Sequence, residues 1–315
     1  MHTIERLPIL VLEPHSRCNC RCVMCDIWKD TEAREISAGE LERHLADIER
    51  LGVEWAVFTG GEPLMHSDLF RLSAMLRSRG IRTTILSSGL LLGRYAAEIV
   101  AGCDDVIVSL DGPAAVHDEI RGIVGAFDAL AKGVRAIHAI APSFPITARC
   151  TVQARNAGHL RATVETARGL GLGSISFLAA DLTSTAFNRP LVWRVDRQAG
   201  VAPELAVLEG EIEALPRDGF VVESAEKLRR IVSHFRAHYG LEAYRAPRCN
   251  APWVSAVVEA NGDVRPCFFH PAVGNLAEGS LGAVVNGTRA VTFRKRLAVE
   301  SDPICRRCVC SLYRE

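Results

Sequence analysis

The chain has 315 residues, 48% of them apolar, so it is long enough to bury a substantial core. Its 37 basic and 37 acidic residues give a net charge of zero, which offers no electrostatic support for binding nucleic acid or a membrane surface. The first residues lack the basic and apolar regions of a secretion signal, and no apolar run is long enough to span a bilayer. We therefore expect a soluble, cytoplasmic protein.

Short β-branched runs alternate with helical segments from residue 7 onward. Apolar residues recur at helical spacing between these runs, for example over 41–48 and 69–76. Strands separated by such helices pair in parallel through right-handed crossovers, so the sequence predicts an α/β fold, a partial (β/α)6 TIM-like barrel. Functional residues of such barrels lie in the loops that follow the strands. The six predicted strands are Leu7–Leu12, Trp55–Thr59, Arg82–Ser87, Asp105–Ser109, Ile146–Val152 and Ser174–Leu178.

Three cysteines with the spacing Cys18-x-x-x-Cys22-x-x-Cys25 directly follow the first predicted strand. Clustered cysteines in a chain without an export signal indicate metal ligation rather than disulfides. Three thiolates can bind three of the four irons of a 4Fe–4S cluster, which leaves one iron open to another ligand. A zinc site is the alternative, and it requires a fourth ligand such as His15 or Cys20.

The second predicted strand ends in Gly60-Gly61-Glu62-Pro63. Two glycines allow a backbone to approach a ligand closely, and a carboxylate suits an ammonium group. The same four residues, taken alone, are also typical of an ordinary turn.

Polar residues also follow the third and fourth predicted strands. Ser87 and Ser88 end the third, and Ser109 and Asp111 follow the fourth, with Arg121 ten residues later. A hydroxyl and a guanidinium are suitable ligands for a carboxylate. Taken alone, however, Arg121 is equally typical of a solvated arginine on a helix.

Together these motifs resemble the radical SAM superfamily, whose hallmark is a CxxxCxxC loop after the first barrel strand. The resemblance implies that Cys18, Cys22 and Cys25 bind a 4Fe–4S cluster whose open iron binds S-adenosylmethionine (SAM). Relatives often have Thr-Asn-Gly where this chain has Ser87-Ser88-Gly89, so the ribose contact there is a departure from the pattern. The residues that the resemblance assigns to SAM are Gly60, Gly61, Glu62, Pro63, Ser87, Ser88, Ser109, Asp111 and Arg121.

A second group of cysteines surrounds a predicted β-hairpin over 254–264, whose turn is Asn261-Gly262. The group resembles the twitch domain, a shortened SPASM domain, which implies one auxiliary 4Fe–4S cluster and therefore two clusters in all. A zinc ribbon is the alternative. We accordingly predict two domains, a radical SAM barrel over 1–239 and a twitch/SPASM-like domain over 240–315. The predicted auxiliary ligands are Cys249, Cys267, Cys305 and Cys308.

Cys310 and Asp181 are the predicted catalytic residues. Cys310 lies two residues past a predicted ligand, and it is a spare ligand, an idle thiol or a hydrogen-atom donor. Asp181 follows the sixth predicted strand, where it either contacts the substrate or caps a loop.

The resemblance implies an enzyme that cleaves SAM reductively and removes hydrogen from a substrate C–H bond. Because the first strand begins at once, with no room for a leader-binding domain, we expect oxidation or epimerisation of a small polar metabolite. Modification of a ribosomally made peptide is the alternative, and a non-catalytic iron–sulfur or zinc protein is a third hypothesis. Relatives use a flavodoxin- or ferredoxin-type electron donor, and we expect no nucleic-acid or membrane partner.

Several other residues are predicted to have no functional role. Cys103 and Cys150 are expected to be small buried hydrophobic residues, and Cys20 to be a thiol that binds no metal. His44 and His66 are expected to face solvent.

Overall fold

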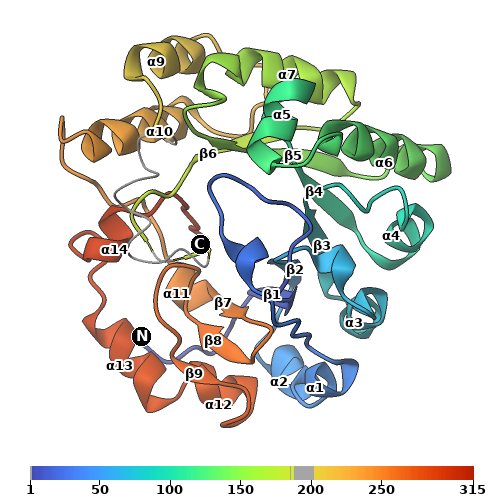
Figure 1. Cartoon of the computed structure of the whole chain (residues 1–315). Coiled ribbons are helices and arrows are strands. Elements are labelled where there is room, and N and C mark those ends of the chain that lie inside the picture. The colour runs from blue at the N-terminus through green and yellow to red at the C-terminus, as the bar shows by residue number, and fades with distance from the viewer. Residues whose placement is uncertain (1, 185, 188–201) are drawn as a thin grey trace.

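The structure is a computed structural model that describes residues 2–184, 186–187 and 202–315. A single sheet in the order β6-β5-β4-β3-β2-β1-β7-β8-β9 curves around an interior, and helices pack outside it (Figure 1). The strands are β1 (Ile9–His15), β2 (Trp55–Gly60), β3 (Arg82–Ser87), β4 (Asp105–Ser109), β5 (Ile146–Val152), β6 (Ile175–Ala179), β7 (Ser255–Val258), β8 (Asp263–Arg265) and β9 (Gly274–Asn275).

The first six strands pair in parallel in chain order, which confirms the predicted fold class. The bounds of β3, β4 and β5 agree with the predicted ranges residue for residue. The first strand is longer than predicted, because His15 continues the pairing with Gly60 and also bridges to Glu35. This extension carries the start of the cysteine loop to the edge of the barrel.

The helices mostly follow the predicted apolar periodicity. The segment over 41–48 is divided into α1 and α2, because the N–H of His44 bonds to the carbonyl of Leu41 only three residues back. The α-helices are α1 (Ala38–Glu42), α2 (Leu45–Arg50), α3 (Leu69–Arg77), α4 (Ala96–Gly102), α5 (Ala114–Arg121), α6 (Ala126–Ile140), α7 (Leu160–Gly169), α9 (Leu205–Glu213), α10 (Ala225–His238), α11 (Ala251–Val254), α12 (Leu281–Val285), α13 (Thr288–Arg296) and α14 (Pro303–Arg306). The short 3₁₀ helices are η1 (Ile27–Lys29), η2 (Pro63–Met65) and η3 (Ala157–His159).

Alternate residues of β1 and of β7 enter two separate apolar clusters. Leu10 and Leu12 belong to the large core between the sheet and the outer helices. Ile9, Val11 and Val257 form a smaller cluster on the opposite face, inside the barrel. We call the space that this inner face surrounds the lumen. Its apolar end is completed by partly buried side chains packed on that cluster, namely Trp55, Phe268 and Leu312.

The C-terminal part of the chain joins the same sheet. β7 pairs in parallel with β1 over four residue pairs, and the predicted hairpin is confirmed by antiparallel pairing of β7 with β8. The predicted domain boundary at residue 240 stays a prediction. The strands on either side of it belong to one continuous sheet.

The predictions for the non-functional residues have mixed outcomes. Cys103 and Cys150 are buried as predicted, but His44 and His66 are also buried, so their predicted exposure is wrong. His66 Nε2 lies 2.9 Å from the carbonyl oxygen of Ile36, so a backbone partner makes its burial tolerable. Among the described residues, no helix has both the length and the apolar character that crossing a bilayer requires.

Candidate functional site

The first cysteine loop connects β1 to η1 and is attached to two neighbouring segments by backbone hydrogen bonds. Arg21 N–H donates to the carbonyl of Arg121 at 2.9 Å, and Val23 N–H donates to that of Ile120 at 3.0 Å. On the other side, Glu62 N–H donates to the carbonyl of Arg17 at 2.9 Å. The loop is therefore held between the end of α5 and the turn after β2.

The three predicted ligands lie on this loop with different exposure. Cys18 and Cys25 are half-buried, whereas Cys22 is buried and Cys20 is more deeply buried still. Cys20 hydrogen-bonds with both Cys18 and Cys22. The pKa of Cys22 is lowered, because the interaction with Cys20 and the adjacent Arg121 outweigh burial. A thiol whose thiolate is favoured, beside two others on one loop, suits binding of an iron–sulfur cluster.

The two glycines after β2 allow the turn to approach the cysteine loop. A Cβ on Gly61 would lie 2.0 Å from the carbonyl oxygen of Arg17, which is an impossible distance. Gly60 has a φ of 92°, and a Cβ there would lie 2.6 Å from the Cβ of Glu13. Pro63 begins η2 and is buried. Gly61 thus approaches the protein's own cysteine loop, and Gly60 approaches β1.

Glu62 is fully buried, and its carboxylate accepts hydrogen bonds from two neighbouring segments. Ser87 Oγ donates at 2.9 Å, the Ser88 N–H at 2.7 Å, and the Leu64 N–H at 3.1 Å, while Ser88 Oγ lies 2.6 Å away. Burial raises the pKa of Glu62, and these donors act in the opposite direction. Ser87 and Ser88, which the resemblance assigns to the SAM ribose, therefore hydrogen-bond to Glu62, which it assigns to the SAM ammonium group. The assignment of all three residues to SAM stays a prediction.

Arg121 lies buried between an aspartate and the cysteine loop. One guanidinium nitrogen is 2.5 Å from Asp111 Oδ2 and another is 3.6 Å from Cys22 Sγ. Burial alone would lower the pKa of Arg121, but the neighbouring negative groups raise it overall. Asp111 in turn accepts a hydrogen bond from the Thr151 N–H at 2.9 Å. Ser109 ends β4, half-buried, so the predicted carboxylate contacts of Ser109 and Arg121 stay predictions.

The four predicted auxiliary ligands come from two separate parts of the sequence and influence one another electrostatically. Burial raises the pKa of Cys267, Cys305 and Cys308, and Cys249 raises each of them further. The backbone of residues 269 and 270 acts to lower the pKa of Cys267. Partly buried thiols are stabilised as thiolates by a bound cation, so the chemistry of these residues fits a metal cluster.

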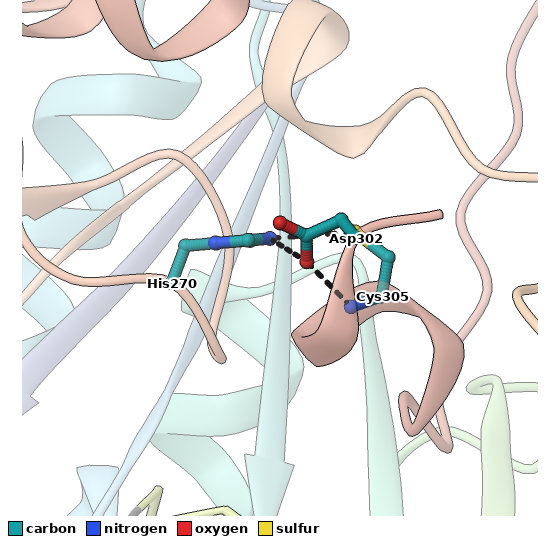
Figure 2. A group of neighbouring side chains, drawn as sticks. All are labelled: His270, Asp302 and Cys305. Atoms are coloured by element: carbon teal, nitrogen blue, oxygen red, sulfur yellow. Dashed lines mark hydrogen bonds and ion pairs between the residues drawn. The ribbon is translucent and has the colours of Figure 1, made fainter. Parts of the chain in front are cut away.

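His270 contacts the auxiliary group and was not predicted. Figure 2 shows its ring pointing toward Asp302 and Cys305, with Nε2 at 3.3 Å from Cys305 Sγ and 3.7 Å from Asp302 Oδ1. The three residues offer ligand atoms that lie within 4.8 Å of one another. The only sequence signal is a histidine three residues after Cys267, which spacing rules for cysteines do not detect.

The two predicted catalytic residues lie beside the auxiliary group. Burial raises the pKa of Cys310 to about 11, while Arg149 on β5 acts to lower it, and Asp181 and Cys267 raise it further. Asp181 accepts hydrogen bonds from the backbone N–H groups of Thr183 at 2.9 Å and of Ser184 at 3.2 Å, as a loop-capping aspartate does. Catalytic roles for Cys310 and Asp181 stay predictions.

Two family models match the chain in the regions just described. The radical SAM superfamily matches residues 12–154, and the SPASM iron–sulfur cluster-binding domain matches residues 249–309. The first region contains the cysteine loop and the turn after β2, and the second contains the four auxiliary cysteines.

Curated proteins and solved structures agree with these matches. An AdoMet-dependent heme synthase from Methanosarcina barkeri is 29% identical over 286 residues, which are 86% of this chain and 79% of that protein. An Fe-coproporphyrin III synthase from the same organism is 37% identical, but over only 41% of this chain and 34% of that protein. A PqqA peptide cyclase from Rhodopseudomonas palustris is 27% identical over 83% of this chain and 67% of that protein.

The fold is shared with Streptococcus suis SuiB, solved with S-adenosylmethionine. The TM-score is 0.72 at 16% identity, over 99% of this chain and 74% of that one. The cofactors of the two matched domains are S-adenosylmethionine and iron–sulfur clusters. This chain belongs to the radical SAM superfamily and carries a C-terminal SPASM-type iron–sulfur cluster-binding domain.

Proposed function

We propose that this enzyme oxidises a small polar molecule held in the lumen, with the auxiliary cluster accepting one electron. The observation that carries the proposal is the position of Arg149. Its side chain is exposed to the lumen in the middle of β5, although its strand neighbours Ala148 and Cys150 are buried in the outer core. Arg149 also acts to lower the pKa of Cys310, which supports a position of the lumen next to the auxiliary cysteines.

The bound SAM and its cluster supply a 5′-deoxyadenosyl radical that takes a hydrogen atom from a substrate carbon. In our proposal Cys18, Cys22 and Cys25 hold that cluster, and Cys249, Cys267, Cys305 and Cys308 hold the auxiliary one. Loss of the hydrogen atom leaves one further electron and one proton to be removed for a two-electron oxidation. A cluster held by Cys249, Cys267, Cys305 and Cys308 would supply the acceptor for that electron.

Residues of the lumen account for the proton and for substrate binding. Arg149 Nε lies 3.3 Å from Ser176 Oγ, and its charge suits a carboxylate or phosphate of the substrate. Glu13 lies on the same face of β1 as Ile9 and Val11, and burial raises the pKa of its carboxyl to about 7. A carboxyl group that ionises near neutral pH can accept the substrate proton.

Modification of a peptide is the second candidate. It is favoured by the match to a PqqA peptide cyclase over 83% of this chain. One AdoMet-dependent heme synthase matches over a similar share, 86% of this chain, and its name does not refer to a peptide, so the relatives divide between the two substrate classes.

Reconstitution under anaerobic conditions tests the proposal first. Two cuboidal clusters predict about eight irons and eight sulfides per chain, and about four in a variant with Cys18, Cys22 and Cys25 changed to alanine. Dithionite and SAM should give 5′-deoxyadenosine with the wild type and not with the variant. Cys103→Ala, which changes a buried thiol outside both groups, is the control. Zinc instead of iron, or no deoxyadenosine, would leave a non-catalytic metal protein as the better conclusion.

Oxidation and epimerisation are separated by Cys310→Ala. If the enzyme is an epimerase that returns hydrogen from this thiol, the Cys310→Ala variant should lose product formation. The wild-type epimerase in D₂O should place deuterium on the substrate carbon. An oxidase should keep its product yield in the variant and place no deuterium there. We expect the second pattern.

A further inference from the structure

A cationic pocket lies between α10, the segment 243–246 and α14, outside the lumen. Its volume is about 400 Å³, and its walls include Arg229, Arg230, Arg245 and Arg306, with Glu226 as an acidic member. Four arginines facing one carboxylate give the pocket a positive charge, in a chain whose net charge is zero. In Figure 1, α10 and α14 lie beside each other on the left of the barrel.

The arginines of the pocket form no ion pairs with acidic groups among the described residues. Arg229, Arg245 and Arg306 are exposed, and none of them forms an ion pair with another described residue. Many surface arginines elsewhere do, as Arg79 does with Glu49 at 2.7 Å. Gathering unpaired like charges is unfavourable in the isolated protein, so their arrangement indicates an anionic partner.

One residue that lines the pocket, Cys308, is a predicted ligand of the auxiliary cluster. Cys308 lines the pocket, and the guanidinium of Arg230 donates to the Cys308 carbonyl oxygen at 2.6 Å. Arg306 Nε donates to the carbonyl of Tyr244 at 3.0 Å, which joins the rim of α14 to the segment 243–246. A partner seated over this pocket therefore lies next to a proposed cluster ligand.

We propose that this pocket is the docking surface of an acidic one-electron carrier protein that exchanges electrons with the auxiliary cluster. The proposal rests on the proposed function, in which each oxidation leaves one electron at that cluster. One electron passes between the cluster and the carrier, the carrier is reduced as the cluster is oxidised, and no bond forms or breaks.

The distribution of the cations favours a protein over a small anion. The exposed arginines come from three separate elements and surround the mouth, as steering charges at the rim of a protein interface do. The half-buried cation, Arg230, is bound to the Cys308 carbonyl instead of being held ready for a ligand.

The pocket variant combines Arg229→Glu and Arg245→Glu. It leaves Arg230, Arg306 and all cysteines in place, so iron content should equal that of the wild type. The carrier is a flavodoxin, used oxidised for binding by calorimetry and as the hydroquinone for stopped-flow reduction of the reconstituted enzyme.

The control variant combines Arg43→Glu and Lys132→Glu. These are exposed cations away from the pocket that also lack an ion pair with a described residue, and the change in net charge is the same. It separates local docking from the effect of overall charge.

We expect the pocket variant to lower the second-order rate constant with flavodoxin by about 10-fold or more at low salt, and to abolish its salt dependence. The control should stay within about 2-fold of the wild type. Equal losses in both variants, or unchanged affinity and salt dependence in the pocket variant, would overturn the proposal.

A second reductant separates this proposal from the proposed function. Photoreduced 5-deazariboflavin is small and uncharged, so the pocket variant should cleave SAM with it at the wild-type rate. If the wild type gives no deoxyadenosine with it, the proposed function fails, while calorimetry still tests docking. If the pocket variant binds flavodoxin normally but loses product with deazariboflavin, the arginines bind an acidic part of the substrate and the docking proposal is wrong.

Discussion

Two buried charged side chains near the cysteine loop have partners within the protein. Glu62 accepts hydrogen bonds from Ser87 and Ser88, and Arg121 contacts Asp111 and Cys22. The first set joins the turn after β2 to the end of β3, and the second joins α5 to the segment after β4 and to the cysteine loop. These residues therefore fix the geometry of the loop, whatever they contact in addition when SAM is bound.

Glu13 makes the stability of the protein depend on pH. Burial and Glu259 raise the pKa of its carboxyl from 4.5 to about 7, although Arg265 opposes them. The folded protein therefore binds more protons than the unfolded chain between these pH values. A stabilising contribution that is fully present below pH 4.5 is lost as the pH rises to 7.

Glu13→Gln should remove this dependence. Relative to the variant, the wild type should lose about 3 kcal/mol of unfolding free energy between pH 5 and pH 8. Anaerobic denaturation curves at several pH values measure the difference. Glu98→Gln, an exposed glutamate on α4, is the control and should follow the wild type. A constant difference between wild type and Glu13→Gln across this range would contradict the assignment.

Sequence alone located the cysteines of both groups, but it could not supply their surroundings. The spacing of Cys18, Cys22 and Cys25 on one loop is a local property of the chain. The contact of His270 with Cys305 is not, since 35 residues separate them and packing of α14 brings them together. The burial of His66 was missed for the same reason, because its partner Ile36 lies on another segment.

At the scale of elements, prediction succeeded where a strand is bounded by its own turn signals. β3, β4 and β5 have β-branched runs with helices on both sides, and their limits were predicted correctly. The end of β1 was not, because its last residues are held by partners on β2 and near Glu35. Tertiary pairing, which local pattern cannot reveal, determines that limit.

The turn after β2 depends on the absence of a side chain at Gly61. Gly61→Ala should displace the cysteine loop, because the new Cβ would meet the Arg17 carbonyl at 2.0 Å. Iron content after reconstitution should fall from about eight to about four per chain. Gly210→Ala in α9 is the matched control, since nothing lies within 4 Å of its Cβ position. That variant should gain about 0.5–1 kcal/mol of stability and keep its iron.

At the scale of the whole molecule, residues close to the carboxyl terminus contribute to the barrel interior. Leu312 packs on the inner cluster with Trp55 and Phe268, and its carbonyl accepts a hydrogen bond from the Asn250 N–H at 2.8 Å. The interior is thus completed by residues from both ends of the chain. Sequence periodicity predicted the strands of the barrel but not this closure.

Leu312→Ala should therefore destabilise the entire fold and not only the terminal residues. We expect a loss of about 2 kcal/mol, the low end for a leucine in a core, because the side chain is only partly buried. Urea unfolding followed by circular dichroism measures it as a shift of a single transition. Leu241→Ala, at a residue that is 62% exposed, should change stability by less than about 0.5 kcal/mol. A separate early transition in the Leu312 variant would show that the C-terminal part unfolds independently.

The pairing of β7 with β1 has a mechanical consequence. β1 leads into the first cysteine loop, while β7 and β8 lie between Cys249 and Cys267, so backbone hydrogen bonds span the gap between the two metal-binding groups. A hinge between them would have to break this ladder. In the proposed enzyme, the spacing between the first cysteine loop and the auxiliary cysteines is consequently set by backbone pairing.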